Sequence, residues 1–318
     1  MEINGATSVT GILGYPIEHT LSPAIQNAAF RESGLNWVYL PFNVHPTKIS
    51  EALLGLAACE CRGLNVTMPH KKVVFDLMDK VEESALIFGA VNTVEFVDGQ
   101  MIGHNTDGLG FLKSLEVEAS FDPNGKRVLI IGAGASAHSI ALSLASAGAA
   151  QIKLLNRTPE KAENIIRLVK SRFEGCAASI EDMRDTAQVV NCDLIVNATS
   201  VGMDINRGLP FSLDLLESGQ IVFDVIYDPP ETEFLKVARG RGARAMNGAG
   251  MLLYQGAAAF SIWTGLPAPI KSMAAALELA LIRDETEETS AANKQPNGKD
   301  YTRREAGHTR STERSQGD

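Results

Sequence analysis

The chain has 318 residues, of which 45% are hydrophobic and 21% are charged, as in a soluble globular enzyme long enough for two domains. Its net charge of −9 argues against nucleic acid or an anionic membrane as the main partner, although locally concentrated basic groups can still bind an anionic substrate. No apolar stretch reaches the roughly 18 residues of a membrane span, and the first residues lack a signal-peptide pattern, so we expect a cytoplasmic protein.

Strand-like and helix-like segments alternate through the first hundred residues. Strands are expected at 9–14, 38–44 and 63–68, helices from Ser22, at 49–58 and at 71–78, and a hairpin at 90–103 with its turn at Asp98-Gly99. Ser22 is expected to be the N-cap of the first helix, with Pro23 in its first turn. Strands separated by helices predict a mostly parallel sheet.

A second alternating set follows a turn at residues 122–125. Strands are expected at 127–131, 152–155, 194–196 and 221–225, and helices at 136–147 and 159–173. This spacing predicts a doubly wound domain. Two later helices, at about 249–263 and 269–283, are expected to pack back on the first domain. Residues 284–318 have almost no apolar side chains, so we expect a disordered tail, with partner binding as the alternative.

The strand at 127–131 leads into a glycine-rich turn, Gly132-Ala133-Gly134-Ala135-Ser136-Ala137. This matches the G-x-G-x-x-A form of the dinucleotide fingerprint: Gly132 permits the turn, Gly134 the approach of a pyrophosphate, and Ala137 close helix packing. The helix that follows offers unpaired N–H groups to the phosphates. The alternative is a turn that only packs small residues.

The residue after the next strand distinguishes the two nicotinamide cofactors. NAD sites usually place a carboxylate there for the ribose 2′-hydroxyl, whereas this strand ends in Leu155-Asn156-Arg157-Thr158. A carboxylate would repel a 2′-phosphate, and Arg157 can bind it by charge-assisted hydrogen bonds. We therefore predict NADP, although Arg157 could also be a solvated surface residue.

Polar residues also gather at the ends of four predicted strands, where open α/β sheets bind ligands. They are His19-Thr20-Leu21-Ser22-Pro23, Asn65-Val66-Thr67-Met68-Pro69-His70-Lys71, Ala90-Val91-Asn92-Thr93 and Asn105-Thr106-Asp107-Gly108. Each has a local alternative, because Ser22 and Asp107 could cap helices and Asn65 or Asn92 could be turn residues. Four such clusters in one half of the chain favour a shared site.

Over residues 8–283 the chain resembles the shikimate dehydrogenases of the shikimate/quinate dehydrogenase family. The resemblance rests on HTLSP, NVTMPHK, GAVNT, GHNTDG, GAGASA, LNRT, NATSVGM and NGAGMLLYQ, which are specific only together. It implies reversible, NADP-dependent reduction of 3-dehydroshikimate to shikimate in aromatic amino-acid biosynthesis. It also implies a split α/β substrate-binding domain, 1–107 with 248–283, around a Rossmann NADP-binding domain at 108–247.

The resemblance further implies roles for individual residues. Lys71 and Asp107 would be the catalytic pair. The substrate's carboxylate and hydroxyls would be held by Thr20, Ser22, Asn65, Thr67, Asn92 and Gln255, with Tyr227 on the carboxylate side. The cofactor would contact the glycine turn, the adenosine-phosphate segment Asn156, Arg157 and Thr158, and the nicotinamide-flanking Thr199, Gly248 and Met251. The chain departs from the family pattern at Thr20, usually Ser, and at Ala135, usually Gly.

Ketone reduction explains why a lysine and a carboxylate are needed together. Hydride addition leaves alkoxide charge that Lys71 can protonate, and the reverse oxidation needs the same group as a base. Desolvation would lower the pKa of this lysine and Asp107 would raise it, so the sequence leaves the net direction open. Asp107 would orient the ammonium and bind a ring hydroxyl.

Three questions stay open at this level. One alternative is a quinate or dual quinate/shikimate dehydrogenase, which could use NAD, and another is a non-catalytic NADP-binding regulator. The oligomeric state is not fixed by the sequence, and a homodimer is one option. The four cysteines, Cys59, Cys61, Cys176 and Cys192, form no Cys-x-x-Cys pair and accompany no histidine cluster, so we expect reduced, packed thiols and no metal site.

Overall fold

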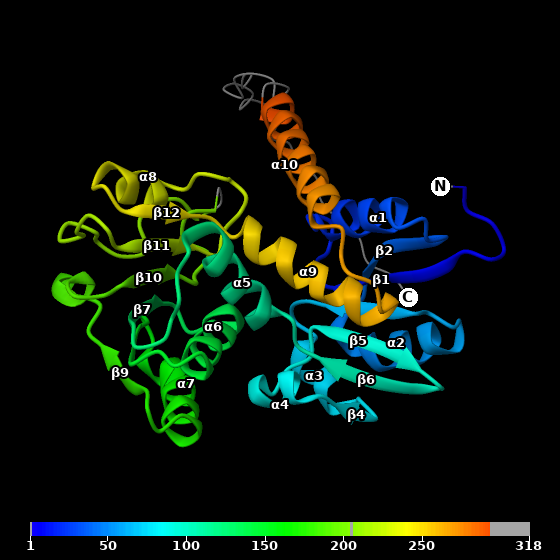
Figure 1. The fold of residues 1–318 in the computed structure, drawn as a ribbon, viewed down its shortest axis with the longest axis horizontal. Coiled ribbons are helices and arrows are strands. Elements are labelled where there is room, and N and C mark those ends of the chain that lie inside the picture. The colour runs from blue at the N-terminus through cyan, green and yellow to red at the C-terminus, as the bar shows by residue number, and fades with distance from the viewer. Residues whose placement is uncertain (1, 204–205, 293–318) are drawn as a thin grey trace, which may run out of the picture.

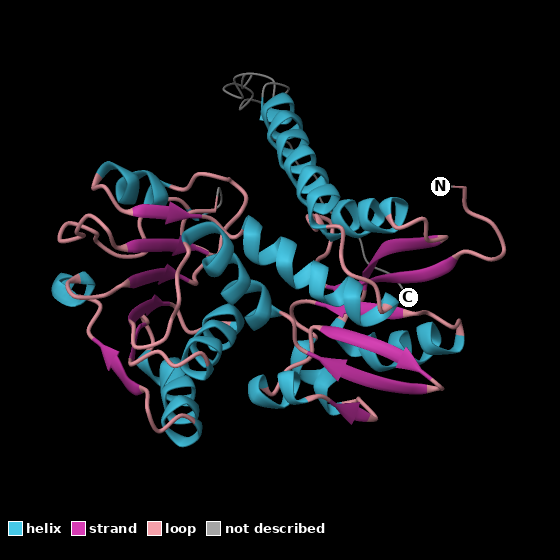
Figure 2. Ribbon diagram, in the orientation of Figure 1, coloured by secondary structure: helices cyan, strands magenta, loops and turns pink. Residues whose placement is uncertain are grey.

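Two sheets of six strands each organise the chain into two lobes (Figure 1). The computed structural model describes residues 2–203 and 206–292, with the backbone alone for 283–292. The fold is α/β, and helices cover the sheets of both lobes (Figure 2). No helix within the described residues has the length and apolar character needed to cross a lipid bilayer.

The first sheet has the strand order β2-β1-β3-β5-β6-β4 and is mixed. β1 pairs in parallel with β2 and β3, whereas the β5–β6 hairpin is antiparallel to β3. The elements of this lobe are β1 Ser8–Gly14, α1 Ser22–Glu32, β2 Trp37–Asn43, a 3-10 turn Pro46–Lys48, α2 Ile49–Ala58, β3 Gly63–Val66, α3 Lys71–Asp76, β4 Lys80–Val81, α4 Glu83–Phe88, β5 Thr93–Val97 and β6 Gln100–His104.

The second sheet has the order β12-β11-β10-β7-β8-β9, and every pair in it is parallel. Its direction reverses between β7 and β10, as in a doubly wound Rossmann fold. The elements are α5 Asp107–Ala119, β7 Arg127–Ile131, α6 Ala135–Ser146, β8 Gln151–Leu155, α7 Pro159–Arg172, β9 Ala177–Glu181, a 3-10 turn Thr186–Val189, β10 Leu194–Asn197, β11 Ile221–Asp224, α8 Glu233–Gly240 and β12 Arg244–Met246.

Local sequence explains the elements that were predicted. β10 and β11 are buried along their whole length, as expected for central parallel strands covered on both faces. α7 has Pro159 in its first turn and buries an apolar stripe at helical spacing, Ala162, Ile165, Ile166 and Val169.

Two expectations about helix ends are corrected. Ser22 is not the N-cap of α1, because the helix begins at Ser22 and Leu21 occupies the cap position without a side-chain bond. The hydroxyl of Ser22 hydrogen-bonds Tyr39 instead. The predicted disorder from residue 284 is wrong for residues 284–292, since α10 (Ile270–Ala292) continues through them. A helix already anchored by packing can extend through residues of good helix propensity. The rest of that tail lies outside the described residues.

The two C-terminal helices return to the first lobe, which confirms the expectation from element order. α9 (Ala249–Thr264) and α10 form an apolar cluster with α1 that includes Phe30, Phe260, Met273 and Leu277. Trp263 of α9 donates its Nε1 proton to the main-chain oxygen of Val94 in β5, at 3.0 Å. These contacts bind the end of the chain to the first sheet.

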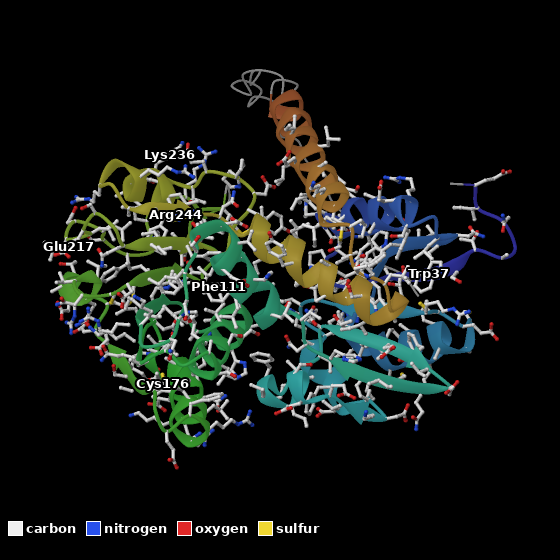
Figure 3. All side chains as sticks on the ribbon, in the orientation of Figure 1. Trp37, Phe111, Cys176, Glu217, Lys236 and Arg244 are labelled. Atoms are coloured by element: carbon white, nitrogen blue, oxygen red, sulfur yellow. The ribbon has the colours of Figure 1, made fainter. Side chains whose placement is uncertain are left out.

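α5 and α9 lie side by side where the lobes meet (Figure 1). A Cβ atom on Gly110 of α5 would lie 2.7 Å from the main-chain oxygen of Met251, so only glycine permits this approach. Phe111, labelled in Figure 3, packs edge-on against Phe223 of β11 with ring centroids 5.0 Å apart. The junction therefore positions α9, which carries two of the predicted site residues, Met251 and Gln255.

Candidate active site

The four polar clusters of the sequence meet in one cavity of about 470 Å³. It is lined from both lobes by all nine residues predicted for catalysis or substrate binding: Thr20, Ser22, Asn65, Thr67, Lys71, Asn92, Asp107, Tyr227 and Gln255. Parallel strands β1 and β3 end at the same edge of the first sheet, which is why residues so distant in sequence meet there.

Lys71 and Asp107 form an ion pair in this cavity. Lys71 Nζ lies 2.5 Å from Asp107 Oδ2, and their side chains are 22% and 14% exposed. Each is the first residue of a helix, Lys71 of α3 and Asp107 of α5. The carboxylate at a helix N-terminus is favoured by the helix dipole, and the main-chain N–H of Asp107 donates to Asn105 Oδ1 at 3.1 Å. The pair is thus held from the backbone.

Asn92 orients the other oxygen of the carboxylate. Its Nδ2 donates to Asp107 Oδ1 at 2.7 Å, and its Oδ1 accepts from the main-chain N–H of Thr106 at 2.8 Å. Asn92 is only 2% exposed. It therefore does more than form a turn: it joins the end of the β5 region to the start of α5.

Asn65 is bonded inside the sheet as well as lining the cavity. Its Oδ1 accepts from the hydroxyl of Tyr39 at 2.7 Å, and its Nδ2 donates to Thr93 Oγ1 at 3.0 Å. Burial raises the pKa of the Tyr39 phenol well above its usual range, and a hydrogen bond from Ser22 opposes that rise. Sequence reasoning missed Tyr39, although its place among the apolar residues of a strand with a polar tip was a usable signal.

The remaining predicted substrate contacts form the wall of the cavity. Thr20 Oγ1 accepts from the main-chain N–H of Ser22 at 3.3 Å, and Gln255 Nε2 donates to the main-chain oxygen of Leu252 at 2.9 Å. Thr67 and Tyr227 complete the polar wall. Hydroxyl, amide and ammonium groups around a small cavity suit a ligand that carries several hydroxyls and a carboxylate.

A second cavity, of about 570 Å³, opens over the glycine turn. Gly132 has a φ of +112°, and a Cβ there would lie 2.7 Å from the main-chain oxygen of Ala198. Gly134 is the N-cap of α6 and faces open space. These features fit a pyrophosphate against the N-terminus of α6, as the fingerprint predicts. The predicted cofactor residues that line this cavity are Gly132, Gly134, Asn156, Arg157 and Thr199.

Lys161 lines the same cavity as Arg157 and was missed by the sequence reasoning. Its position four residues after Arg157, at the start of the predicted helix, was the available signal. No acidic side chain occurs among the described residues that line this cavity. The charge therefore suits an anionic group such as a 2′-phosphate.

Other predicted cofactor residues lie elsewhere. Ser136, Gly248 and Met251 line the first cavity, so the glycine turn and α9 border both spaces. Ala137 is fully buried, in keeping with its predicted packing role. Two residues lie outside both cavities: Ala135, which lines a neighbouring crevice, and Thr158, the N-cap of α7, whose main-chain oxygen accepts from Asn156 Nδ2 at 2.7 Å.

A buried network that the sequence did not reveal holds the strand ends beside Thr199. Thr199 Oγ1 donates to Asn197 Oδ1 at 2.7 Å, and Asn197 Nδ2 donates to Asp224 Oδ1 at 2.9 Å. Burial raises the pKa of Asp224 to about 6, against opposing hydrogen bonds from Thr232, the N–H of Ile226 and Asn197. The network ties β10 to β11.

Gly248 allows β11 and α9 to meet. A Cβ at this residue would lie 2.1 Å from the main-chain oxygen of Val225. Within residues 2–203 and 206–292, no group of three or more His, Cys, Asp or Glu side chains is arranged to hold a metal ion. All four cysteines are free, and Cys59 is exposed where packed thiols were expected, whereas the other three are buried.

Three family models match successive parts of the chain. Residues 12–94 match the shikimate dehydrogenase substrate binding domain, residues 116–207 the shikimate / quinate 5-dehydrogenase family, and residues 248–278 the shikimate 5′-dehydrogenase C-terminal domain.

Individual proteins agree with these matches. The chain is 42% identical over 275 residues to the shikimate dehydrogenase (NADP(+)) of Desulforamulus reducens, covering 85% of this chain and 94% of that protein. The structure of shikimate 5-dehydrogenase from Listeria monocytogenes, with shikimate and NAD, has 37% identity and a TM-score of 0.81, covering 86% and 97% of the two chains. Quinate dehydrogenase from Corynebacterium glutamicum, with NAD, has 29% identity and a TM-score of 0.80, covering 85% and 98%. On this similarity, the chain belongs to the shikimate dehydrogenase family.

Proposed function

We propose that this protein is a shikimate dehydrogenase that reduces 3-dehydroshikimate to shikimate, reversibly and with NADP, in the biosynthesis of aromatic amino acids. The D. reducens relative carries that name and cofactor, and the L. monocytogenes structure holds shikimate. The observation that carries the proposal is the Lys71–Asp107 pair, which lies in a polar cavity bordered by the dinucleotide turn.

In this proposal Lys71 is the acid and base of the reaction. The bound cofactor supplies or accepts the hydride. As alkoxide charge develops on the ring oxygen, the ammonium of Lys71 donates a proton to it, and in the reverse direction the amine accepts that proton. Asp107 keeps the ammonium directed into the cavity and accepts a hydrogen bond from a ring hydroxyl. Lining side chains exclude part of the water around the pair.

The remaining cavity residues bind and orient the ring. We assign the substrate carboxylate and hydroxyls to Thr20, Ser22, Asn65, Thr67, Asn92 and Gln255, with Tyr227 on the carboxylate side. These groups supply donors and acceptors at fixed places, which lowers the entropy that must be lost on reaching the transition state.

The cofactor assignment follows the second cavity. The pyrophosphate would lie at the turn and helix start formed by Gly132, Gly134, Ala135 and Ser136, with Ala137 allowing the close helix packing. Arg157 and Lys161 would hold the 2′-phosphate, with Asn156 and Thr158 along the adenosine. Thr199, Gly248 and Met251 would flank the nicotinamide.

The domain boundaries belong to the same proposal. We assign substrate binding to residues 1–107 and 248–283 and NADP binding to 108–247, in agreement with the substrate-domain match at residues 12–94. A biosynthetic reduction that draws on NADPH suits a cytoplasmic location. A homodimer is the assembly to test, by analytical ultracentrifugation.

The proposal is tested with Lys71→Ala in a shikimate oxidation assay that follows NADPH formation. Loss of the general acid and base should lower kcat about 10²- to 10⁴-fold with little change in the KM for shikimate. Lys72→Ala is the matched control, since Lys72 is the exposed neighbour on α3 and does not line the first cavity. A near-normal kcat in Lys71→Ala would contradict the assigned role.

A quinate or dual-specificity enzyme is the second candidate, because the C. glutamicum relative is a quinate dehydrogenase that binds NAD. Thr20 adds a methyl group where the family usually has serine, and this group bears on how the extra hydroxyl of quinate would fit. Measuring kcat/KM for shikimate and quinate with both cofactors separates the candidates. Measurable turnover of either acid also excludes a non-catalytic regulator.

A further inference from the structure

A line of buried polar side chains crosses the first sheet behind the wall of the substrate cavity. In order its members are Tyr39, Asn65, Thr93, Asn92 and Asp107, and successive donor and acceptor atoms lie 2.7, 3.0, 2.9 and 2.7 Å apart. Tyr39 and Thr93 are 1% and 0% exposed, and neither is among the side chains that line the cavity. The chain therefore includes two polar residues that do not reach the substrate.

Each link has a definite donor and acceptor. The Tyr39 hydroxyl donates to Asn65 Oδ1, so Asn65 Nδ2 faces Thr93 Oγ1 and, at 3.3 Å, the main-chain oxygen of Asn92. The Thr93 hydroxyl accepts from Asn65 and gives its own proton to Asn92 Oδ1. The Nδ2 of Asn92 is thereby left facing the carboxylate of Asp107. Turning the Asn65 amide over would bring its oxygen against the Asn92 carbonyl oxygen.

The chain ends on the carboxylate that holds the catalytic ammonium. Asp107 accepts from Asn92 on Oδ1 and from Lys71 on Oδ2. If Asn92 moves, the carboxylate loses one of its two side-chain partners and can rotate, and the ammonium moves with it. A displacement of about 1 Å at a reacting group can lower a rate roughly 100-fold.

We infer that Tyr39 and Thr93 are positioning residues for the Lys71–Asp107 pair, acting through Asn65 and Asn92. The inference rests on the proposed function, because it concerns the residues assigned to that reaction. It assigns to two residues of β2 and β5 an effect on the chemical step, although neither contacts the substrate. Buried hydrogen-bond chains of this kind act as a unit, so the loss of one link weakens the others.

The first test compares Thr93→Val, Thr93→Ser and Thr10→Val. Thr10 is the matched control: it is fully buried in β1, lies beside Tyr39 in the strand register, and donates to the Val38 oxygen at 3.0 Å without joining the chain. Thr93→Val should lower kcat for shikimate about ten-fold or more, with the KM for NADP+ within about two-fold of wild type. Thr93→Ser keeps the hydroxyl and should retain most of kcat.

Thr10→Val separates positioning from general destabilisation. It should lower the midpoint of urea unfolding about as much as Thr93→Val does, with kcat within about two-fold of wild type. Equal kcat losses in the two valine variants, or a normal kcat in folded Thr93→Val, would overturn the inference.

Tyr39→Phe provides an independent test at the other end of the chain, and it decides the matter if Thr93→Val fails to fold. It should also lower kcat, and the double variant with Thr93→Val should be no slower than the slower single variant, because both break the same chain. Losses of kcat that multiply, or a normal kcat in Tyr39→Phe, would count against it.

Failure of this inference is distinguishable from failure of the proposed function. If wild-type protein does not oxidise shikimate with NADP+, the proposed function fails and the inference falls with it. If wild type is active and both hydroxyl deletions keep a normal kcat, only the inference is wrong.

Discussion

Arg157 and Lys161 are the cations of the cavity over the glycine turn, and no carboxylate accompanies them among its described lining residues. We predict that Arg157→Ala lowers kcat/KM for NADP+ about 10- to 100-fold, since a hydrogen bond to a charged group contributes roughly 1.5–3 kcal/mol. Efficiency with NAD+ should change little. Initial rates with both cofactors measure the ratio.

Arg239→Ala is the control for this prediction, because Arg239 is an exposed arginine of α8 that pairs with Glu231 outside the cavity. An unchanged ratio of NADP+ to NAD+ efficiency in Arg157→Ala would show that another group binds the 2′-phosphate, and Lys161→Ala would then be the next variant to measure.

Asp224 makes stability depend on pH. Burial raises its pKa from 3.8 to about 6, so between about pH 4 and pH 6 the folded protein binds the proton more tightly than the unfolded chain does. The contribution of Asp224 to stability is therefore greatest below pH 4 and falls as the pH rises, by about 3 kcal/mol once the pH exceeds 6.

Asp224→Asn removes this titration. The unfolding free energy of the variant minus that of wild type should increase by about 3 kcal/mol between pH 4 and pH 7, and urea denaturation of both proteins across that range measures it. Taking the difference cancels the titration of the other groups. Parallel stability curves would show that Asp224 does not titrate in this window.

Among the secondary-structure elements, the contact of α5 with α9 depends most on glycine. A Cβ on Gly110 would lie 2.6 Å from the main-chain nitrogen of Gln255 and 2.7 Å from the main-chain oxygen of Met251. We predict that Gly110→Ala lowers the unfolding free energy by about 1–3 kcal/mol through overpacking. It should also raise the KM for shikimate, because α9 carries Gln255.

Gly55→Ala in α2 is the matched control, since nothing lies within 4 Å of the added Cβ. There the gain in helix propensity should raise the unfolding free energy by about 0.5–1 kcal/mol without affecting KM. Chemical denaturation and steady-state kinetics of the two variants give both quantities. A stabilised Gly110→Ala would mean that the two helices separate without cost.

At the scale of the whole molecule, Arg172 joins the two lobes. It is the last residue of α7, and its guanidinium donates to the main-chain oxygens of Leu86 and Ile87 in α4. The substrate cavity is lined from both lobes, so their separation affects the binding of either ligand. Arg172→Ala should raise the KM for shikimate and for NADP+ about two- to ten-fold, the range expected for one lost hydrogen bond.

Because Arg172 is exposed, the unfolding free energy should change little. Arg167→Ala is the control on the same helix, since Arg167 bonds only within α7, to Asn164 Oδ1 at 2.7 Å. Steady-state kinetics and urea denaturation of both variants test the idea. An effect on neither KM in Arg172→Ala would mean that this contact does not hold the lobes together.

Much of the fold was predictable because it is encoded locally. Fully apolar runs such as those of β10 and β11, the fingerprint at Gly132 and Gly134, and Pro159 at a helix start all act within a few residues. Elements of two to five residues, β4, β9 and β12, were missed because so short a segment has no clear period. The extent of α10 was missed because its final residues lack an apolar pattern.

By itself the sequence determined the two alternating α/β halves, the dinucleotide turn and the residue types needed for ketone reduction, because these depend on neighbouring residues. Only the tertiary structure decided that Lys71 lies 2.5 Å from Asp107, that Tyr39 stands behind Asn65, and that Asp224 is buried with a raised pKa. Such facts depend on which strands become neighbours and how much water is excluded, and both follow from packing across the whole chain.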